Sequence, residues 1–313
     1  MRLTFLGYGG IAEEHAQAFK RLGAAGEGVQ FSAVMGRVEE SARRFADRHG
    51  FERATVSLDE ALDCPSDAVV IASPSDLHAE QTVACLRAEK HVLCEIPLSV
   101  NLDDALEAAR FAESSSKQLM ICHTQRFFPA LQELRRRVEN GEFRLKQIVC
   151  RWGFLRRKNE NWKGQKRSWT DNLLWHHGAH VIDMAVWMLG ETEIVDVKGI
   201  LAPPTPPLNI PLDLNMCFKT ASGAVVSAAM SYNTRRPFHD YLFIGEEETY
   251  RYQNGKLYAA DQVVYEGGAH ALEAQNAEFL AAVRGNRAPS VSAEEIMPAM
   301  RILQAVQDQN GAP

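Results

Sequence analysis

The stretch RLTFLGYGGIA, residues 2–12, decides the fold of the first part of this chain. A short apolar strand runs into Gly7-Tyr8-Gly9-Gly10-Ile11-Ala12, which has the pattern G-x-G-x-x-A. In a dinucleotide-binding unit the glycines allow a tight turn and close approach of the backbone to a pyrophosphate, and the small last residue lets the next helix pack on the strand. Because a strand precedes the motif and a helix is expected at 11–23, we interpret it as a nucleotide-binding turn rather than a purely structural one.

Strands and helices then alternate up to residue 123. We expect strands at 30–35, 67–72, 91–95 and 118–123, separated by helices at 38–49, 77–90 and 102–116. This alternation predicts an α/β domain with a parallel, doubly wound sheet, a Rossmann domain over residues 1–122. Ligands of such sheets bind at the carboxyl ends of the strands, which brings Gly7, Arg37, Ser73, Glu95 and His123 to one edge.

The end of the second strand indicates which nicotinamide cofactor is bound. An NAD enzyme usually presents Asp or Glu there to hold the ribose 2′-hydroxyl, but this chain has Gly36-Arg37. An arginine can pair with a 2′-phosphate that a carboxylate would repel. NADP is therefore the expected cofactor, NAD remains an alternative, and the structural interpretation of Arg37 is a surface residue that begins a helix.

Composition narrows the class of protein. The chain has 313 residues, of which 46% are hydrophobic and 24% charged, with a net charge of −6. That balance is ordinary for a globular protein and argues against a general binder of nucleic acid or anionic membranes. Six scattered cysteines without metal-ligand spacing predict buried apolar thiols and no metal site. No signal-peptide pattern is present at MRLTFLGYGG, so we expect a cytoplasmic protein.

A basic segment precedes three histidines in FLRRKNENWKGQKRSWTDNLLWHHGAHVID, residues 154–183. Cations able to hold an anionic substrate thus stand beside groups that transfer protons near neutral pH. On the helix expected at 172–189, His176 and His180 share one face, and Thr170 or Asp171 is the expected N-cap. A solvated basic loop followed by an amphipathic helix is the structural alternative.

The remaining chain, residues 123–313, predicts a second α/β domain with an open, mostly antiparallel sheet. Strands are expected at 193–198, 213–219, 225–231, 241–244 and 249–253, and helices at 270–284 and 293–309. The Pro-rich stretch LAPPTPPLNIP, residues 201–211, indicates a loop.

Five motifs together resemble the glucose–fructose oxidoreductase/inositol dehydrogenase/MocA (Gfo/Idh/MocA) family. They are GYGGIA at 7–12, SPSDLH at 73–78, EIPL at 95–98, HTQRFFP at 123–129 and HHGAHVID at 176–183. The family pattern has E-K-P and then D-x-x-x-H, whereas this chain has Ile96 in the lysine position and His176 in the aspartate position. Both changes, with the run from Phe154 to Asn159, resemble a branch of the family that oxidises a dicarboxylate semialdehyde in aromatic catabolism.

The resemblance implies a set of site residues. His180 is the expected base, His176 or His177 its hydrogen-bond partner and Asp183 its orienter. The expected cofactor-binding residues are Gly7, Gly9, Gly10, Ile11, Ala12, Arg37, Ser73, Pro74, His78, Glu95 and Pro97. The expected substrate-binding residues are Arg126, Arg156, Arg157, Arg167, Trp169 and Asn233.

Three functions follow as hypotheses. The first is NADP-dependent oxidation of a small dicarboxylate semialdehyde, and the second is a sugar or polyol dehydrogenase on the same scaffold. The third is a cofactor-binding regulator without catalysis. The resemblance also implies a homodimer or homotetramer formed through the second domain's sheet, and no nucleic-acid or membrane partner.

Overall fold

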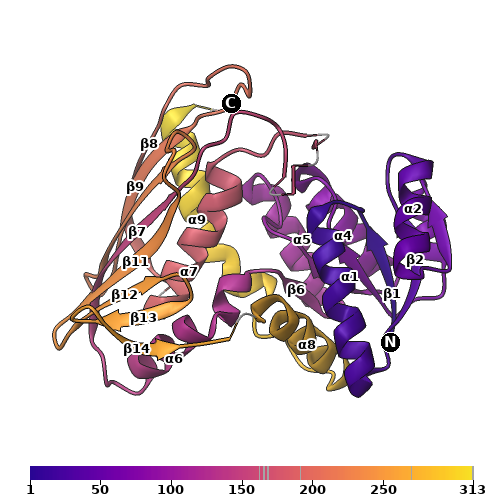
Figure 1. The fold of residues 1–313 in the computed structure, drawn as a ribbon, viewed down its shortest axis with the longest axis horizontal. Coiled ribbons are helices and arrows are strands. Elements are labelled where there is room, and N and C mark those ends of the chain that lie inside the picture. The colour runs from indigo at the N-terminus through magenta and orange to yellow at the C-terminus, as the bar shows by residue number, and fades with distance from the viewer. Residues whose placement is uncertain (162, 165, 168, 191, 269, 312–313) are drawn as a thin grey trace. The chain divides into compact units, whose positions relative to one another are not determined.

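The computed structural model describes the chain except residues 162, 165, 168, 191, 269 and 312–313. Its contacts divide the chain into two compact units (Figure 1). Unit 1 comprises Met1–Cys122, Asn161–Ser168 and Leu272–Glu295, and unit 2 comprises His123–Glu160, Trp169–Ala271 and Ile296–Pro313. Among the described helices, none is long and apolar enough to cross a membrane.

Unit 1 is built on a parallel sheet with the strand order β3-β2-β1-β4-β5-β6. Its strands are β1 (Arg2–Leu6), β2 (Gln30–Met35), β3 (Arg53–Thr55), β4 (Ala68–Ile71), β5 (His91–Cys94) and β6 (Leu119–Ile121). Every residue of β4 is buried, as expected for a central strand that is covered on both faces. The predicted doubly wound Rossmann sheet is confirmed.

Helices connect these strands. They are α1 (Gly10–Leu22), α2 (Glu39–His49), α3 (Leu58–Asp63), α4 (His78–Arg87) and α5 (Leu102–Ser114), with short turns η1 (Gly23–Glu27) and η2 (Ser75–Leu77). Helix α8 (Ala271–Arg284) comes from the far end of the chain and packs in unit 1, where Asn276 contacts His15 of α1. The sequence analysis missed β3 and α3, because β3 has 3 residues and is shorter than the run that strand patterns require.

Unit 2 contains a mixed sheet with the order β14-β13-β12-β11-β7-β10-β9-β8. Its strands are β7 (Leu145–Gly153), β8 (Ile194–Leu201), β9 (Asp213–Thr220), β10 (Val225–Ser231), β11 (Phe238–Gly245), β12 (Thr249–Gln253), β13 (Lys256–Ala259) and β14 (Gln262–Glu266). Neighbouring strands are antiparallel except β7 and β10, which are parallel. The mostly antiparallel sheet is as predicted, although β7, β13 and β14 were not foreseen.

One face of this sheet is packed against helices. Unit 2 carries η3 (Thr124–Phe127), α6 (Pro129–Glu139), η4 (Leu174–Gly178), α7 (Ala179–Leu189) and most of α9 (Ala293–Asn310). In β9 buried and exposed residues alternate, which is the signature of a sheet with one face on the core. Gly199 of β8 lies against Val306 of α9, where a Cβ would collide with the valine side chain. Figure 1 shows α7 and α9 on the same side of the sheet.

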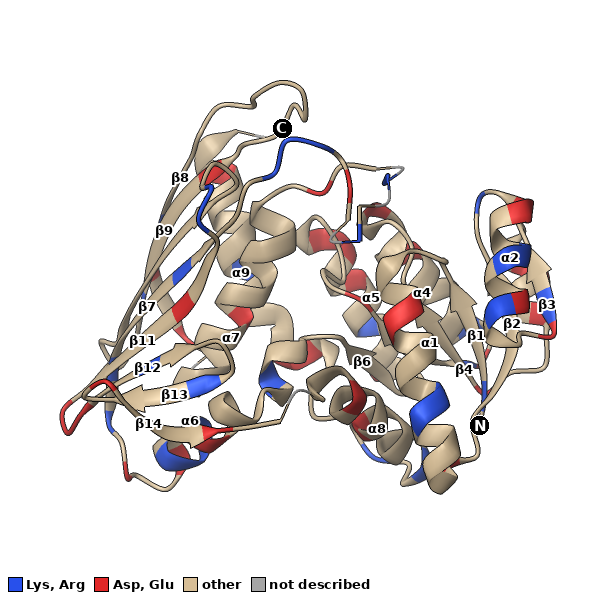
Figure 2. Cartoon of the chain, viewed as in Figure 1, with Lys and Arg blue, Asp and Glu red and all other residues tan. Residues whose placement is uncertain are grey.

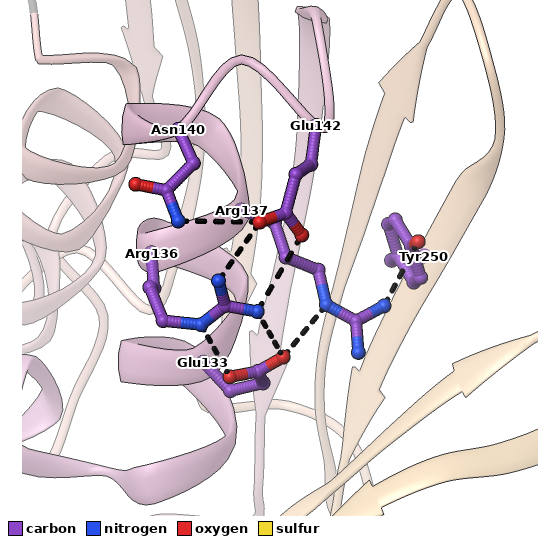
Figure 3. Close-up of polar contacts among 6 residues, drawn as sticks. All are labelled: Glu133, Arg136, Arg137, Asn140, Glu142 and Tyr250. Carbon is purple, nitrogen blue, oxygen red and sulfur yellow. Dashed lines mark hydrogen bonds and ion pairs between the residues drawn. The ribbon is translucent and has the colours of Figure 1, made fainter.

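Some charged side chains are paired within one helix. Figure 2 shows positive and negative residues side by side along α2 and α6. In α6, Glu133 accepts hydrogen bonds from Arg136 and Arg137, while Arg136 also reaches Glu142 beyond the helix end (Figure 3). Arg137 also donates to the Tyr250 hydroxyl of β12 at 3.0 Å. This network fastens α6 to the sheet.

Candidate active site

The glycine turn after β1 has the geometry of a phosphate-binding loop. Gly7 has a φ of +112°, and a Cβ there would collide with the carbonyl oxygen of Ala72, so only glycine fits. Gly9 is the N-cap of α1 and has open space around its α-carbon, and no side chain caps the helix. The first N–H groups of α1 therefore remain for an anion such as a pyrophosphate. Ala12 is fully buried, as close packing of α1 on the sheet requires.

Gly36, the residue after β2, is also restricted to glycine by a neighbouring side chain. A Cβ at this position would overlap the ring of Tyr8, which lies against the end of β2. An Asp or Glu at this position, as NAD enzymes usually have, would therefore require Tyr8 to move. The next residue, Arg37, is exposed and has no ion-pair partner among the described residues.

In the segments that follow β4 and β5, one predicted cofactor-binding residue has a different position from the expected one. His78 was expected to bind the cofactor, but it is 1% exposed and its two ring nitrogens lie 2.8 Å from the Pro97 oxygen and 3.0 Å from the Ser73 oxygen. His78 therefore bridges the segments that follow these two neighbouring strands instead of facing a ligand. Pro97 follows a cis peptide bond from Ile96, and Ile96 is buried at 3% exposure in the place of the family lysine.

Contacts within unit 1 fix the orientation of the Glu95 carboxylate. One carboxylate oxygen lies 2.8 Å from Nε2 of His15, and the other accepts from the Ile96 N–H at 3.2 Å. Asn276 contacts the other His15 nitrogen at 3.0 Å. The thiol of Cys122 lies beside this pair. One side-chain nitrogen, oxygen and sulfur atom of His15, Glu95 and Cys122 respectively all lie within 4.8 Å of one another. The histidine and the carboxylate thus satisfy each other, and Glu95 has a fixed orientation at the strand end.

The predicted cysteine burial is correct for five residues and wrong for Cys217. Cys64, Cys85, Cys94, Cys122 and Cys150 are buried, whereas Cys217 is exposed on β9. Burial raises the pKa of the Cys85 thiol to about 12.

The histidine segment of unit 2 begins differently from the expected helix. Asn172, rather than Thr170 or Asp171, caps it, because its Oδ1 accepts from the Leu174 and Trp175 N–H groups at 2.7 and 3.3 Å. The segment then forms the π-helical turn η4 before α7. Such turns are frequent at functional sites because they alter which side chains share a face.

The three histidines lie together with aromatic rings. The His176 ring is 4.6 Å from His177 and 6.1 Å from His180 between centroids. His180 lies against Trp152 of β7 at 5.7 Å, and Trp152 also stacks on His239 of β11 at 4.3 Å. The sequence analysis missed Trp152 and His239 because their strands are far apart in the chain.

Burial sets the protonation state of this cluster. Desolvation lowers the pKa of His180 well below its usual value, with smaller electrostatic contributions from His176, His123 and His239. Burial also lowers the pKa of His239 to about 4. His180 was expected to keep a pKa near 6.5; the structure instead keeps its imidazole neutral over a wider pH range. Its Nδ1 is buried and has no hydrogen-bond partner among the described residues, which leaves Nε2 for a substrate.

Asp183 does not orient His180 as expected. Its carboxylate lies 3.2 Å from Nδ1 of His123 and accepts two hydrogen bonds from Arg126, at 2.9 and 2.7 Å. His177 places Nδ1 2.6 Å from the hydroxyl of Tyr232, and His176 places Nε2 3.4 Å from Asp171.

The predicted substrate-binding arginines fall into two groups. Arg126 and Arg156 are each 6% exposed and engaged by buried aspartates, Arg126 by Asp183 and Arg156 by Asp171 at 2.5 Å. Their guanidinium groups form internal ion pairs, and substrate contact by these two arginines remains a prediction. Arg157 is exposed and donates to Asn233 at 2.7 Å.

Two other residues were predicted to contact the substrate. Arg167 is half-buried in the segment of unit 1 at Asn161–Ser168. Trp169 is half-buried in unit 2, and its carbonyl oxygen accepts from Asn159 at 2.8 Å. For both residues substrate contact remains a prediction.

Comparison with known proteins agrees with this geometry. Residues 1–123 match a family described as "Oxidoreductase family, NAD-binding Rossmann fold", and residues 129–265 match "Bacterial oxidoreductases, C-terminal". A 4-carboxy-2-hydroxymuconate-6-semialdehyde dehydrogenase from Sphingobium sp. is 33% identical over 310 residues, which cover 97% of this chain and 96% of the relative. A myo-inositol 2-dehydrogenase from Thermotoga maritima is 34% identical over 145 residues, 45% of this chain and 41% of the relative.

Solved structures share the fold. A levoglucosan dehydrogenase in complex with NADH and levoglucosan aligns with a TM-score of 0.87 at 21% identity, over 98% of this chain and 95% of that one. A UDP-N-acetylglucosamine 3-dehydrogenase from Acidithiobacillus ferrooxidans aligns with a TM-score of 0.85 at 21% identity, over 99% and 97%. By its two family matches and its full-length relative, the chain belongs to the Gfo/Idh/MocA family of oxidoreductases, with an NAD(P)-binding Rossmann domain.

Proposed function

We propose that the protein is an NADP-dependent dehydrogenase that oxidises 4-carboxy-2-hydroxymuconate-6-semialdehyde, in its cyclic hemiacetal form, to 2-pyrone-4,6-dicarboxylate, a step of aromatic catabolism. The observation that carries the proposal is the 33% identity to a dehydrogenase of that name over 97% of this chain. The relatives named as inositol dehydrogenases match less than half of it. Ile96 and His176, which replace the usual family lysine and aspartate, also argue against sugar or polyol chemistry.

The proposed chemistry assigns one proton transfer to the histidine cluster. Oxidation of the hemiacetal carbon breaks its C–H bond and its O–H bond and forms the carbonyl of the lactone. Bound NADP supplies the acceptor for the hydride. The hydroxyl proton passes to Nε2 of His180, whose lowered pKa keeps the imidazole neutral and ready to accept it. The exclusion of water by Trp152 and the neighbouring rings favours this neutral form.

NADP is the proposed cofactor because of what stands at the end of β2. An acid in place of Gly36 would require Tyr8 to move, and Arg37 has no carboxylate partner among the described residues to compete with a 2′-phosphate. A guanidinium paired with phosphate is a strong charge-assisted contact.

An absorbance assay of nicotinamide reduction tests the proposal. The protein is incubated with the semialdehyde, glucose or myo-inositol, each with NADP and with NAD. We expect reduction with the semialdehyde and NADP at a kcat/KM far above every other combination. Turnover of inositol or glucose in preference to the semialdehyde would overturn the proposal in favour of a polyol dehydrogenase. Cofactor binding without any turnover would favour a regulator.

We also propose that a second copy of the chain covers the outer face of the sheet in unit 2, giving a homodimer or homotetramer. This face carries Ile200 at 73% exposure and Val225 at 40%, beside the exposed Cys217. Exposed apolar side chains on one sheet face are typical of an interface. The test is light scattering of the parent and of Ile200→Lys, together with labelling of Cys217. A parent that is monomeric at every concentration contradicts this assembly.

A further inference from the structure

Arginines of unit 2 differ in how their charge is balanced. Arg126 and Arg156 each contact an aspartate directly, at 2.7 and 2.5 Å, and both pairs are buried. Arg157 has no carboxylate within ion-pair distance among the described residues. It is the neighbour of Arg156 in the chain, yet its side chain is exposed. The first two arginines are neutralised within the protein, and the third keeps its charge.

The Arg157 guanidinium is nevertheless held in place. Nη1 donates to the backbone oxygens of Arg156 and Tyr232, both at 2.9 Å, and Nη2 donates to Oδ1 of Asn233 at 2.7 Å. A guanidinium has five N–H donors, so the Nε hydrogen and one Nη2 hydrogen have no acceptor among the described residues. A carboxylate can accept both. The side chain has thus lost much of its freedom before a ligand arrives, which lowers the entropy cost of binding.

Asn233 is in turn fixed by an aspartate. Its Nδ2 donates to Oδ2 of Asp213 at 2.5 Å, and Asp213 accepts at its other oxygen from the Ser231 hydroxyl at 2.6 Å. Asp213 is at the start of β9 and Ser231 at the end of β10, which the sheet register pairs. Asp213 has no cation within ion-pair distance among the described residues. The amide of Asn233 therefore stands between a positive and a negative group that do not touch each other.

This arrangement differs from an ordinary surface ion pair. A direct pair between Arg157 and Asp213 would occupy the guanidinium and cancel its charge. The interposed amide instead donates to the carboxylate and accepts from the guanidinium, so each hydrogen bond polarises the other. The result is a cation that is oriented but still available.

Tyr232 links this cation to the proposed catalytic histidines. Its backbone oxygen accepts from Arg157, while its hydroxyl lies 2.6 Å from Nδ1 of His177. The ring of Phe154 contacts both Tyr232 and His177, at 5.1 and 5.3 Å between centroids. Tyr232 thus contacts Arg157 through its backbone and His177 through its side chain, which places the cation on the same residue that borders the histidine cluster.

We propose that Arg157 binds one carboxylate of the substrate and that Asp213, acting through Asn233, is the positioning residue that holds it. This inference rests on the proposed function for the dicarboxylate, although the binding site itself requires only a carboxylate. It assigns a role to Asp213, which does not touch the substrate.

Binding of pyridine-2,4-dicarboxylate, measured by calorimetry on the cofactor-loaded protein, tests the site without turnover. We expect Arg157→Ala to weaken binding about ten- to a hundredfold, the value of a charge-assisted hydrogen bond. Asp213→Ala should weaken it less, about three- to tenfold, since it loosens the guanidinium without removing it. Asp213→Asn keeps an acceptor for Asn233 and should recover most of the loss. Asp196→Ala, an exposed aspartate of β8 paired with Lys198, is the matched control and should bind as the parent does.

Kinetics with the semialdehyde separate positioning from folding. Asp213→Ala should raise KM with little change in kcat, and the defect should shrink for an analogue that lacks one carboxylate. If Arg157→Ala and Asp213→Ala are folded and bind the dicarboxylate as the parent does, the inference is wrong. If the parent binds it through Arg157 but does not oxidise the semialdehyde, the proposed function fails and the site stands. A parent that oxidises the semialdehyde but binds no pyridine dicarboxylate contradicts the inference and leaves the proposed function standing.

Discussion

Arg126 donates two hydrogen bonds to the carboxylate of Asp183, from Nε to Oδ2 at 2.9 Å and from Nη2 to Oδ1 at 2.7 Å. Both side chains are buried, and His123 lies 3.2 Å from the same carboxylate. The pair joins η3, where unit 2 begins, to α7, the helix that contains His180. It therefore holds α7 in place.

Loss of either member should destabilise the protein strongly. Asp183→Ala removes the carboxylate that pairs with the buried Arg126 guanidinium, which costs about 3–5 kcal/mol. Urea unfolding followed by tryptophan fluorescence measures the change. Glu39→Gln, which breaks the exposed i,i+4 pair with Arg43, is the control and should cost less than about 0.5 kcal/mol. A small effect for Asp183→Ala would mean that solvent reaches the pair.

Cofactor preference should depend on Arg37. Arg37→Ala removes the cation proposed to meet the 2′-phosphate, so KM for NADP should rise about ten- to a hundredfold while KM for NAD changes little. Steady-state kinetics with both cofactors provide the measurement. Arg43→Ala, an exposed arginine of α2 that already pairs with Glu39, should leave both values unchanged. Equal losses for the two cofactors would exclude the assignment.

Removal of the proposed base should lower turnover. His180→Ala is expected to reduce kcat about 10²- to 10⁴-fold, the usual contribution of general base catalysis, with the affinity for NADP nearly unchanged. His176→Ala should cost less, because Asp171 already engages that ring. Near-parental turnover in the His180 variant would move the base to His176 or His177.

The pH profile of the parent is a separate test of the same residue. A base must be neutral to accept a proton, and the pKa of His180 is lowered well below its ordinary value, chiefly by burial. Activity should therefore persist below about pH 6.5 and fall only in more acidic solution. This acid limb should disappear in the His180 variant. A fall in activity centred on the ordinary histidine pKa would instead show that the His180 ring is solvated in the working enzyme.

The α6 network should contribute stability that depends on pH. Hydrogen bonds from Arg136 and Arg137 lower the pKa of Glu133 to about 2, from the ordinary value of 4.5 (Figure 3). A folded-state pKa below the unfolded one adds stability that is complete above the unfolded pKa and is lost as the pH falls toward 2. Because Arg136 is exposed and solvent screens its charge, Glu133→Gln should cost about 1 kcal/mol or less near neutral pH.

Urea unfolding near pH 7 and near pH 3 measures this dependence. The difference between the parent and Glu133→Gln should shrink at the lower pH. Glu139→Gln, at the end of the same helix, breaks a single pair between the exposed Glu139 and the half-buried Arg135 and is the matched control. A difference that stays constant between the two conditions would attribute the effect to packing.

The sequence alone determined the parts that follow from local pattern. The glycine turn at Gly7, the buried run of β4 and the strand–helix alternation predict the parallel sheet, because each depends on neighbours in the chain. The same is true of β10 and β12, whose bounds agree with the predicted strands at 225–231 and 249–253. The histidine segment was found for the same reason, because its residues are close in sequence.

Only the tertiary structure decided which charges are free. Arg126, Arg156 and Arg157 look alike in sequence, but Asp183 and Asp171 neutralise the first two and a distant asparagine and aspartate hold the third. The partners come from segments that are far apart in the chain, so no local periodicity reveals them. The pKa of His180 was equally inaccessible, because burial beside Trp152 sets it. Sequence placed the chemical groups, and long-range packing fixed their charge and their availability.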